Sequence, residues 1–152
     1  MPKIISRNFG AVEFSPGEQF VFPNGLPGFP CETDFLPVEV PDQLPLVYLQ
    51  SLRTSDLCFV AAPVNCVVED YQLCADAEDL TLIDLGPDNA RGPQTLCLAL
   101  LCFAEDGRAT ANLRAPLIVN LRNRRGVQAI RNDDRYAFRF PLQAAGGGSA
   151  CS

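Results

Sequence analysis

The sequence contains no histidine, and this absence removes a large class of catalytic sites. Histidine is the usual general base near neutral pH, so Ser-His and Cys-His nucleophile pairs cannot be built from this chain. A Cys-x-x-Cys motif is also missing, although the chain has seven cysteines at irregular spacing. An odd number at this spacing fits neither a tetrahedral metal site nor a disulfide framework. Cys58, Cys97 and Cys102 lie in apolar segments, where we expect free, buried thiols.

Long apolar runs are absent as well. The longest one, Thr95–Ala104, is far shorter than the ~20 residues of a membrane span, and the first residues lack the apolar core of a signal peptide. We therefore expect a cytoplasmic protein that does not bind membranes. The loop at Asn24–Gly28 lacks the Gly-Lys-Ser/Thr ending of a phosphate-binding loop, and no paired carboxylates stand in an apolar setting. We expect no enzyme activity, no cofactor and no metal.

The residues that are present predict one all-β domain. A chain of 152 residues can bury ~70% of its unfolded surface without help from metals or disulfides. Short extended segments alternate with turns rich in Gly, Pro and Asp, which is typical of a β-meander. The predicted strands cover residues 4–5, 11–14, 19–22, 34–40, 46–52, 57–62, 71–74, 95–104, 110–113, 117–121, 127–130 and 136–142. The prediction is a small closed or nearly closed antiparallel β-barrel-like domain over residues 1–142, followed by a disordered Gly-rich tail at 143–152.

One short helix is expected near residues 77–82. Asp76 stands at the N-cap position, where its carboxylate can accept a hydrogen bond from the first turn. Glu78 and Asp79 in that turn also suit the positive end of the helix dipole. Part of the local acidity therefore has a structural explanation.

The stretch Ala111–Leu121 is expected to form two extended pieces joined at Arg114-Ala115-Pro116. Pro116 has no N–H and keeps the residue before it extended, so the ladder is interrupted there. Asn112 and Asn120 can bond the backbone groups that the interruption leaves without partners. The loop at residues 24–30 holds Leu26 and Phe29 between glycines and prolines, and we expect it to close one end of the core rather than to form an exposed recognition loop.

Charge is unevenly distributed along the chain. Residues 1–107 hold 4 basic and 16 acidic side chains, whereas residues 108–152 hold 8 basic and 2 acidic ones, and the whole chain carries −6. The net sign disfavours direct binding of nucleic acid, which needs a basic face. A basic protein, such as an RNA-binding protein, is the natural complement to an acidic surface.

Several motifs together resemble the FliW family of bacterial flagellar assembly factors. In chain order they are Gly25-Leu26-Pro27-Gly28-Phe29, Tyr48-Leu49-Gln50-Ser51, the segment Ala111–Asn120, Gly126-Val127-Gln128 and Tyr136. The resemblance runs from about Phe20 to Leu142. It implies a β-barrel-like regulator without enzyme activity, which binds the RNA-binding translational repressor CsrA and also flagellin. Flagellin then competes with the repressor, so that its translation is coupled to its secretion.

Three hypotheses about a site follow. The densest run of negative charge predicts a CsrA-binding surface at Glu69, Asp70, Glu78 and Asp79. An alternative is a small-molecule or anion-binding barrel that uses the basic turn of Arg122, Arg124, Arg125 and Arg131. The third is a redox sensor built on Cys66 and Cys74.

Overall fold

The computed structural model describes residues 3–6, 9–86 and 92–142, and the tail predicted at 143–152 lies outside them. Most of the regular structure is β. The strands are β1 (Lys3–Ser6), β2 (Gly10–Glu13), β3 (Phe20–Val21), β4 (Asp34–Val38), β5 (Val47–Ser51), β6 (Cys58–Pro63), β7 (Thr95–Phe103), β8 (Ala109–Ala111), β9 (Leu117–Asn120), β10 (Arg125–Gln128) and β11 (Phe140–Pro141). The helices are η1 (Pro41–Gln43), α1 (Val64–Val67) and α2 (Ala77–Leu82).

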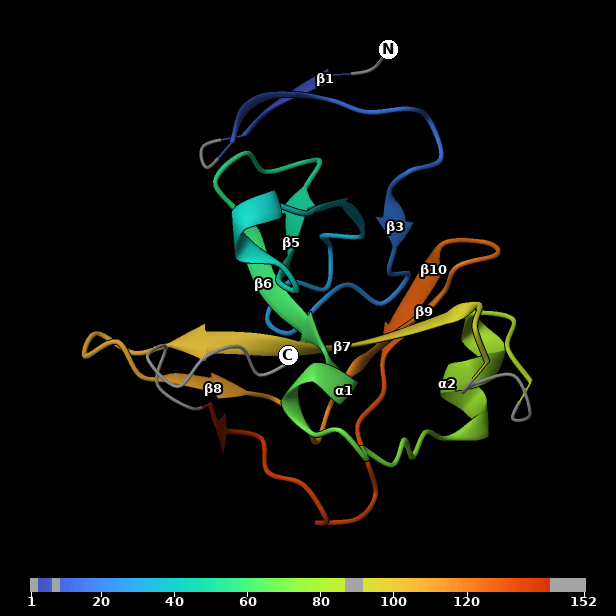
Figure 1. The fold of residues 1–152 in the computed structure, drawn as a ribbon. Helices are drawn as coiled ribbons and strands as arrows, with labels where there is room; N and C mark the ends of the chain where they lie inside the picture. The colour runs from blue at the N-terminus through green and yellow to red at the C-terminus, as the bar shows by residue number, and fades with distance from the viewer. Residues whose placement is uncertain (1–2, 7–8, 87–91, 143–152) are drawn as a thin grey trace.

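Within the described residues, seven strands close into a barrel (Figure 1). Their order is β7-β6-β5-β4-β3-β10-β9, and β9 returns to pair with β7. Six of the seven pairs are antiparallel, whereas β3 and β10 run parallel. An odd number of strands cannot alternate in direction all the way around a ring, so one parallel pair is unavoidable. The predicted barrel is therefore confirmed, and its purely antiparallel pairing is corrected at that seam.

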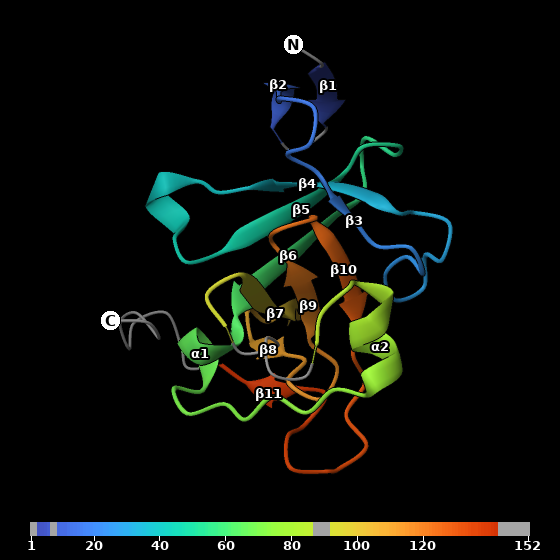
Figure 2. The same cartoon turned by 90° about the vertical axis from the view of Figure 1, so that its right-hand side faces the viewer.

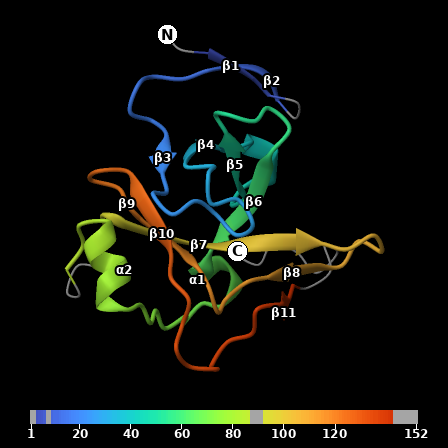
Figure 3. The same cartoon turned by 180° about the vertical axis from the view of Figure 1, so that it is seen from behind.

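Strand β7 is the centre of the sheet because it pairs with three other strands. It contacts β6 through Leu100↔Ala61, β9 through Leu98↔Leu117 and β8 through Leu101↔Ala111. The prediction that the whole strand is buried is wrong at its C-terminal end, where Cys102 and Phe103 are exposed. Figures 1 and 3 show the reason, because this end of β7 extends past the barrel to carry β8.

The stretch Ala111–Leu121 forms the two predicted extended pieces on one edge of β7. Between the Ala111↔Leu101 and Leu117↔Leu98 pairs, this chain advances three residues more than β7 does. The surplus is accommodated as a bulge around Pro116. The Asn112 side chain accepts the Ala115 N–H at 3.0 Å, as expected for an amide beside an interrupted ladder.

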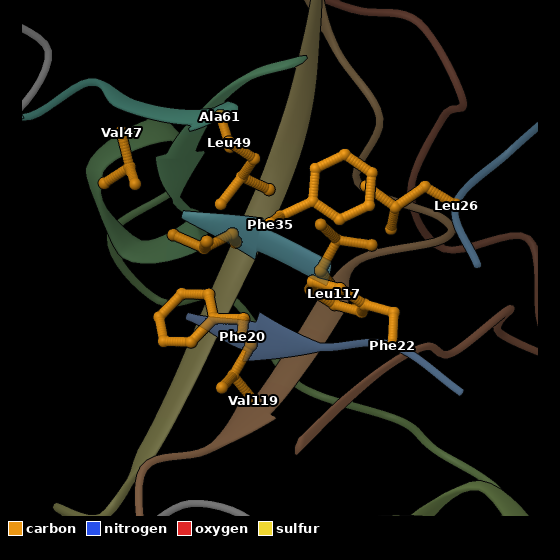
Figure 4. Close-up of a cluster of buried hydrophobic side chains, with 10 residues drawn as sticks. Phe20, Phe22, Leu26, Phe35, Val47, Leu49, Ala61, Leu117 and Val119 are labelled. Atoms are coloured by element: carbon orange, nitrogen blue, oxygen red, sulfur yellow. The ribbon is translucent and has the colours of Figure 1, made fainter. Parts of the chain in front are cut away.

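The core of the barrel is built from alternate residues of each strand, as the two-residue period of β structure requires. Figure 4 shows these inward-facing side chains meeting across the barrel. Phe22, Phe35, Leu49 and Leu117 are fully buried. In the loop at residues 24–30, Leu26 closes one end of this cluster, while Phe29 is 42% exposed and lies edge-on to Phe59. The loop therefore closes the core through Leu26 only.

Three local predictions are corrected. The helix at 77–82 forms as predicted, but α1 and η1 add short helical turns to it. No strand forms at residues 71–74, because side chains satisfy the backbone there: the Gln72 N–H donates to the Tyr136 hydroxyl and the Gln72 carbonyl accepts from Arg131. Of the last predicted strand, at 136–142, only β11 forms. Arg114 Nε donates to the Tyr136 carbonyl and the Leu113 N–H donates to the Ala137 carbonyl, so the backbone before β11 is bonded in another way.

Candidate functional site

The predicted acidic residues lie on the two ends of segment 64–82, next to its two helices. Glu69 and Asp70 are exposed in the turn that follows α1, and Glu78 is exposed in the first turn of α2. Asp79 is half-buried; this burial, followed by the negative charges of Asp76 and Glu78, raises the pKa of its carboxyl group. Asp76 stands at the N-cap, but its side chain makes no capping hydrogen bond, which corrects that part of the prediction.

The structure does not bring these acidic residues into one cluster. α1 packs against β6 and β7, whereas α2 packs against β10. Figures 1 and 2 show the two helices on different sides of the molecule, joined by an extended segment. Glu69 and Asp70 therefore form one acidic pair, and Glu78 and Asp79 a second.

The acidic turn at Glu69 and Asp70 is fixed to the barrel by the next residue, Tyr71. Its hydroxyl donates to the Leu113 carbonyl at 2.6 Å, and its ring stacks on that of Tyr136 with the centroids 4.5 Å apart. Burial raises the pKa of Tyr71 to about 12, so the phenol stays protonated and remains a donor.

Arg131 completes this anchor by lying against both tyrosine rings. Its side chain is 2% exposed, and its guanidinium lies 4.8 Å from the centroid of Tyr136 and 5.6 Å from that of Tyr71. It donates to both carboxylate oxygens of Asp133, at 2.7 and 2.9 Å, and also to the Gln72 carbonyl. The hydrogen bond to Asp133 is the main reason that the pKa of Arg131 is raised. We call the set Tyr71, Tyr136, Arg131 and Asp133 the tyrosine–arginine anchor.

The second acidic pair is held through the C-terminal end of α2. The Asn120 amide donates to the Ile83 carbonyl at 3.0 Å, and the Asn123 amide donates to the same oxygen at 3.1 Å. Asn120 was predicted to serve the ladder around Pro116, but its amide fixes α2 to β9 instead. Both acidic pairs are thus positioned by residues of, or next to, the Ala111–Leu121 stretch.

The four arginines of the predicted anion site lie in three different settings. Arg122 and Arg125 are exposed, whereas Arg131 is committed to the tyrosine–arginine anchor. Arg124 lies over the Phe20 ring, 4.6 Å from its centroid, and donates to the Glu18 carbonyl. The side chains do not converge on one cavity, so this arrangement does not support an anion-binding site.

The cysteines also depart from the sequence-based interpretation. Cys58 and Cys97 are free and partly buried, as expected, but Cys102 is free and exposed. Cys66 is disulfide-bonded, although the irregular spacing disfavoured disulfides. Cys74 is free and donates to the Asn132 side chain at 3.6 Å, so the two residues of the predicted redox sensor are not joined to each other. In the described ranges, no group of three or more acidic or Cys side chains could hold a metal ion.

Sequence reasoning missed the tyrosine–arginine anchor because its members are far apart in the chain. Tyr71 and Tyr136 are separated by more than sixty residues, and no local pattern links them. The available signal was weak: Tyr136 was part of the family resemblance, and Tyr71 directly follows the acidic pair.

Comparison with known proteins identifies the family to which the chain is similar. The model of the FliW protein family matches residues 3–142. The flagellar assembly factor FliW of Syntrophomonas wolfei is 33% identical over 141 residues, which cover 92% of this chain and 88% of that protein. The FliW of Syntrophotalea carbinolica is 31% identical, over 95% of this chain and 100% of its own.

A solved structure agrees with the sequence comparisons. The crystal structure of a flagellar assembly factor FliW superposes with a TM-score of 0.82 at 27% identity, covering 95% of this chain and 99% of that one. In the described part of this chain, no helix has both the length and the apolar character required to cross a bilayer. The family match over almost the whole chain, together with the shared barrel, shows that this protein belongs to the FliW family of flagellar assembly factors.

Proposed function

We propose that this protein binds the RNA-binding repressor CsrA and flagellin in the cytoplasm, and that it has no catalytic activity. Binding of the acidic protein beside the RNA site of the repressor opposes RNA by charge and by bulk. Flagellin competes for the protein, so accumulation of unsecreted flagellin releases the repressor. The proposal treats residues 1–142 as one binding domain that contacts neither nucleic acid nor membrane itself.

One observation carries the choice of surface for the repressor. Glu69 and Asp70 are exposed, yet they precede a fixed tyrosine, whose hydroxyl donates to the Leu113 carbonyl and whose ring stacks on Tyr136. A charged pair on a fixed turn loses little conformational entropy when it docks against a basic surface. Glu78 and Asp79 form a second, separate contact region in this proposal.

Charge reversal tests the surface. The double variant Glu69→Lys/Asp70→Lys should weaken binding to purified CsrA by about tenfold, ~1.4 kcal/mol, at low salt. The effect should shrink as salt rises, because exposed charges are screened. Isothermal titration calorimetry at about 0.05 and 0.3 M salt measures both affinities.

The matched control is Glu105→Lys/Asp106→Lys, which makes the same charge change at an exposed turn after β7. Equal weakening by both double variants would mean that only net charge matters and would contradict the surface assignment. A Glu78→Lys variant tests the second pair alone. Addition of purified flagellin to the preformed complex should release the repressor, and failure to release it would contradict the competition.

A further inference from the structure

One end of the barrel is an open apolar mouth. The inward-facing rows of several strands end there: Pro37 and Glu39 continue the row of Phe35, while Leu96 and Pro63 continue those of Leu98 and Ala61. The cavity at this end has a volume of about 550 Å³, which is within the range of ligand pockets. It is lined by Glu18, Phe20, Pro37, Glu39, Leu44, Pro45, Val47, Pro63, Leu96 and Arg124. We call this cavity the barrel mouth.

The walls of the barrel mouth are apolar and one rim residue is strongly exposed. Phe20 and Val47 belong to the buried core and form the floor, with Leu96 packed against them. Leu44 is 58% exposed at the rim. A side chain entering the mouth would therefore contact apolar atoms on the floor and on the rim, which is the setting of an anchor residue in a protein interface.

The charge at the rim is negative. Glu18 and Glu39 line the mouth and are exposed, and neither carboxylate forms an ion pair within the described part of the chain. Glu18 accepts the Ser15 N–H at 2.7 Å, which fixes its side chain at the rim. Asp42 is exposed in η1, between Glu39 and Leu44. The one cation that lines the mouth, Arg124, has its guanidinium over Phe20 and bonded to the Glu18 backbone.

Arg124 also contributes a buried side-chain nitrogen to the wall of the mouth. Its Nε is buried and has no partner, and it is the only such side-chain atom among the residues described. Because this Nε is buried, a docked segment does not contact it, and its signal reports changes in the packing of the Arg124 side chain within the wall of the mouth.

We propose that the barrel mouth is a docking site for a basic, apolar segment of a partner protein. An aliphatic or aromatic side chain enters the mouth, and flanking Lys or Arg side chains contact Glu18 and Glu39. The site is distinct from the acidic turn at Glu69 and Asp70, so failure of one assignment leaves the other intact.

Nuclear magnetic resonance titration of the full chain with a short synthetic peptide of alternating leucine and lysine tests the proposal. Chemical shifts should change at Glu18, Glu39 and Leu44, together with the side-chain Nε–H signal of Arg124. Glu39→Lys and Leu44→Ser should each weaken binding at least about fivefold, because one reverses the rim charge and the other removes rim apolar area. Glu105→Lys, at the distant turn after β7, is the matched control and should leave binding unchanged.

Three results would overturn the proposal. The first is equal binding of a peptide in which glutamate replaces every lysine, since the rim charge would then be irrelevant. The second is a set of shifts centred on Glu69 and Asp70 with none at Arg124 Nε. The third is a concentration-dependent shift at Leu44 and Glu39 without peptide, which would identify a second copy of the chain as the occupant.

Discussion

Arg131 links segments that are far apart in sequence. Its guanidinium contacts Tyr71 and Gln72 before α2, Asp133 in the following turn and Tyr136 near the end of the domain. Such a buried cation requires its carboxylate partner, because an unpaired buried charge is costly. At the residue scale, the stability of the protein should therefore depend on the ionisation of Asp133.

The first prediction is a loss of stability in acid that depends on Asp133. The hydrogen bond from Arg131 lowers the pKa of Asp133 below its ordinary value of 3.8, and hydrogen bonds from Ser51 and Thr54 lower that of Glu32 below 4.5. A lowered folded-state pKa contributes stability above the ordinary value, and this contribution is lost as pH falls through the lowered one. The raised pKa of Asp79 acts in the opposite direction. Urea unfolding at pH 7 and at pH 3 should show a lower midpoint in acid.

Two asparagine variants isolate the contribution of this residue. Asp133→Asn should lower the urea midpoint at pH 7 and flatten its dependence on pH, since residue 133 can no longer ionise. Asp134→Asn changes the exposed neighbouring carboxylate and should behave like the unmodified protein. The same pH dependence in both variants would show that the ion pair with Arg131 is not its source.

The second prediction concerns thiol reactivity. Burial raises the pKa of Cys97 to about 12, so this cysteine holds almost no thiolate at neutral pH. Cys31 and Cys102 are free and exposed. A short pulse of iodoacetamide under native conditions, followed by peptide mass spectrometry, should label Cys31 and Cys102 and leave Cys97 unmodified. Labelling of Cys97 at the rate of Cys102 would contradict the burial of the Cys97 thiol.

At the scale of elements, the sequence was informative wherever a local pattern decides the structure. The turn residues before the segment at 46–52 and the cap position before Ala77–Leu82 are local signals, and both elements form where they were predicted. The strand predicted at 71–74 fails because side chains of Arg131 and Tyr136, about sixty residues away, bond its backbone. The parallel seam between β3 and β10 likewise depends on the number of strands in the ring, which no single segment encodes.

The candidate surfaces show the same division. The exposure of Glu69 and Asp70 follows from their position in a polar turn, which the sequence displays. The barrel mouth could not be predicted, because Glu18, Glu39 and Leu96 meet only when the ring closes. The sequence also could not show that the four arginines lie apart, since Arg131 is buried by partners from other segments.

The third prediction is that Asn120 positions α2. Its amide donates to Ile83 at 3.0 Å and its oxygen accepts the Arg122 N–H at 3.0 Å, while the residue is buried. Asn120→Ala should cost about 1–3 kcal/mol of unfolding free energy, because the Ile83 carbonyl and the Arg122 N–H lose a partner. Hydrogen exchange across Ala77–Leu82 should accelerate more than that of the barrel strands.

Asn112→Ala is the matched control for this experiment. It removes an amide from the same stretch, but its bond to the Ala115 N–H lies at the bulge, away from α2. Exchange across α2 should stay unchanged in this variant. Equal acceleration of α2 exchange in both variants would contradict a specific role for Asn120.

At the scale of the whole molecule, the unequal charge of the two halves is redistributed by the fold. Acidic side chains of the first half flank the barrel mouth and the turn after α1, so they lie on separate parts of the surface. Two basic side chains of the second half make contacts within the protein: Arg124 lies over the Phe20 ring, and Arg131 is bonded to Asp133. The rim of the barrel mouth and the turn after α1 are therefore two separate acidic surfaces, which suit basic protein partners.

The ring of strands has one weak point, the parallel seam between β3 and β10. Its register contains the single pair Arg125↔Val21, supported by the Val21 N–H bonded to the Arg124 carbonyl at 2.9 Å. The β7–β9 pair, by contrast, holds four register pairs. Because local opening is easiest where few backbone bonds must break, the barrel should open first at the seam.

The fourth prediction follows from Gly126, which lies beside that seam. A Cβ atom at this position would stand 2.4 Å from Cε1 of the fully buried Phe22. Gly126→Ala must therefore displace the Phe22 side chain, which directly follows β3. The substitution should cost about 1–3 kcal/mol and should accelerate amide exchange at Val21 while exchange in β9 changes less. Gly86→Ala is the control, because nothing lies within 4 Å of its added Cβ atom. Uniform acceleration over β3 and β9 would show that the ring opens as one unit, and unchanged exchange at Val21 would show that the seam is not its weak point.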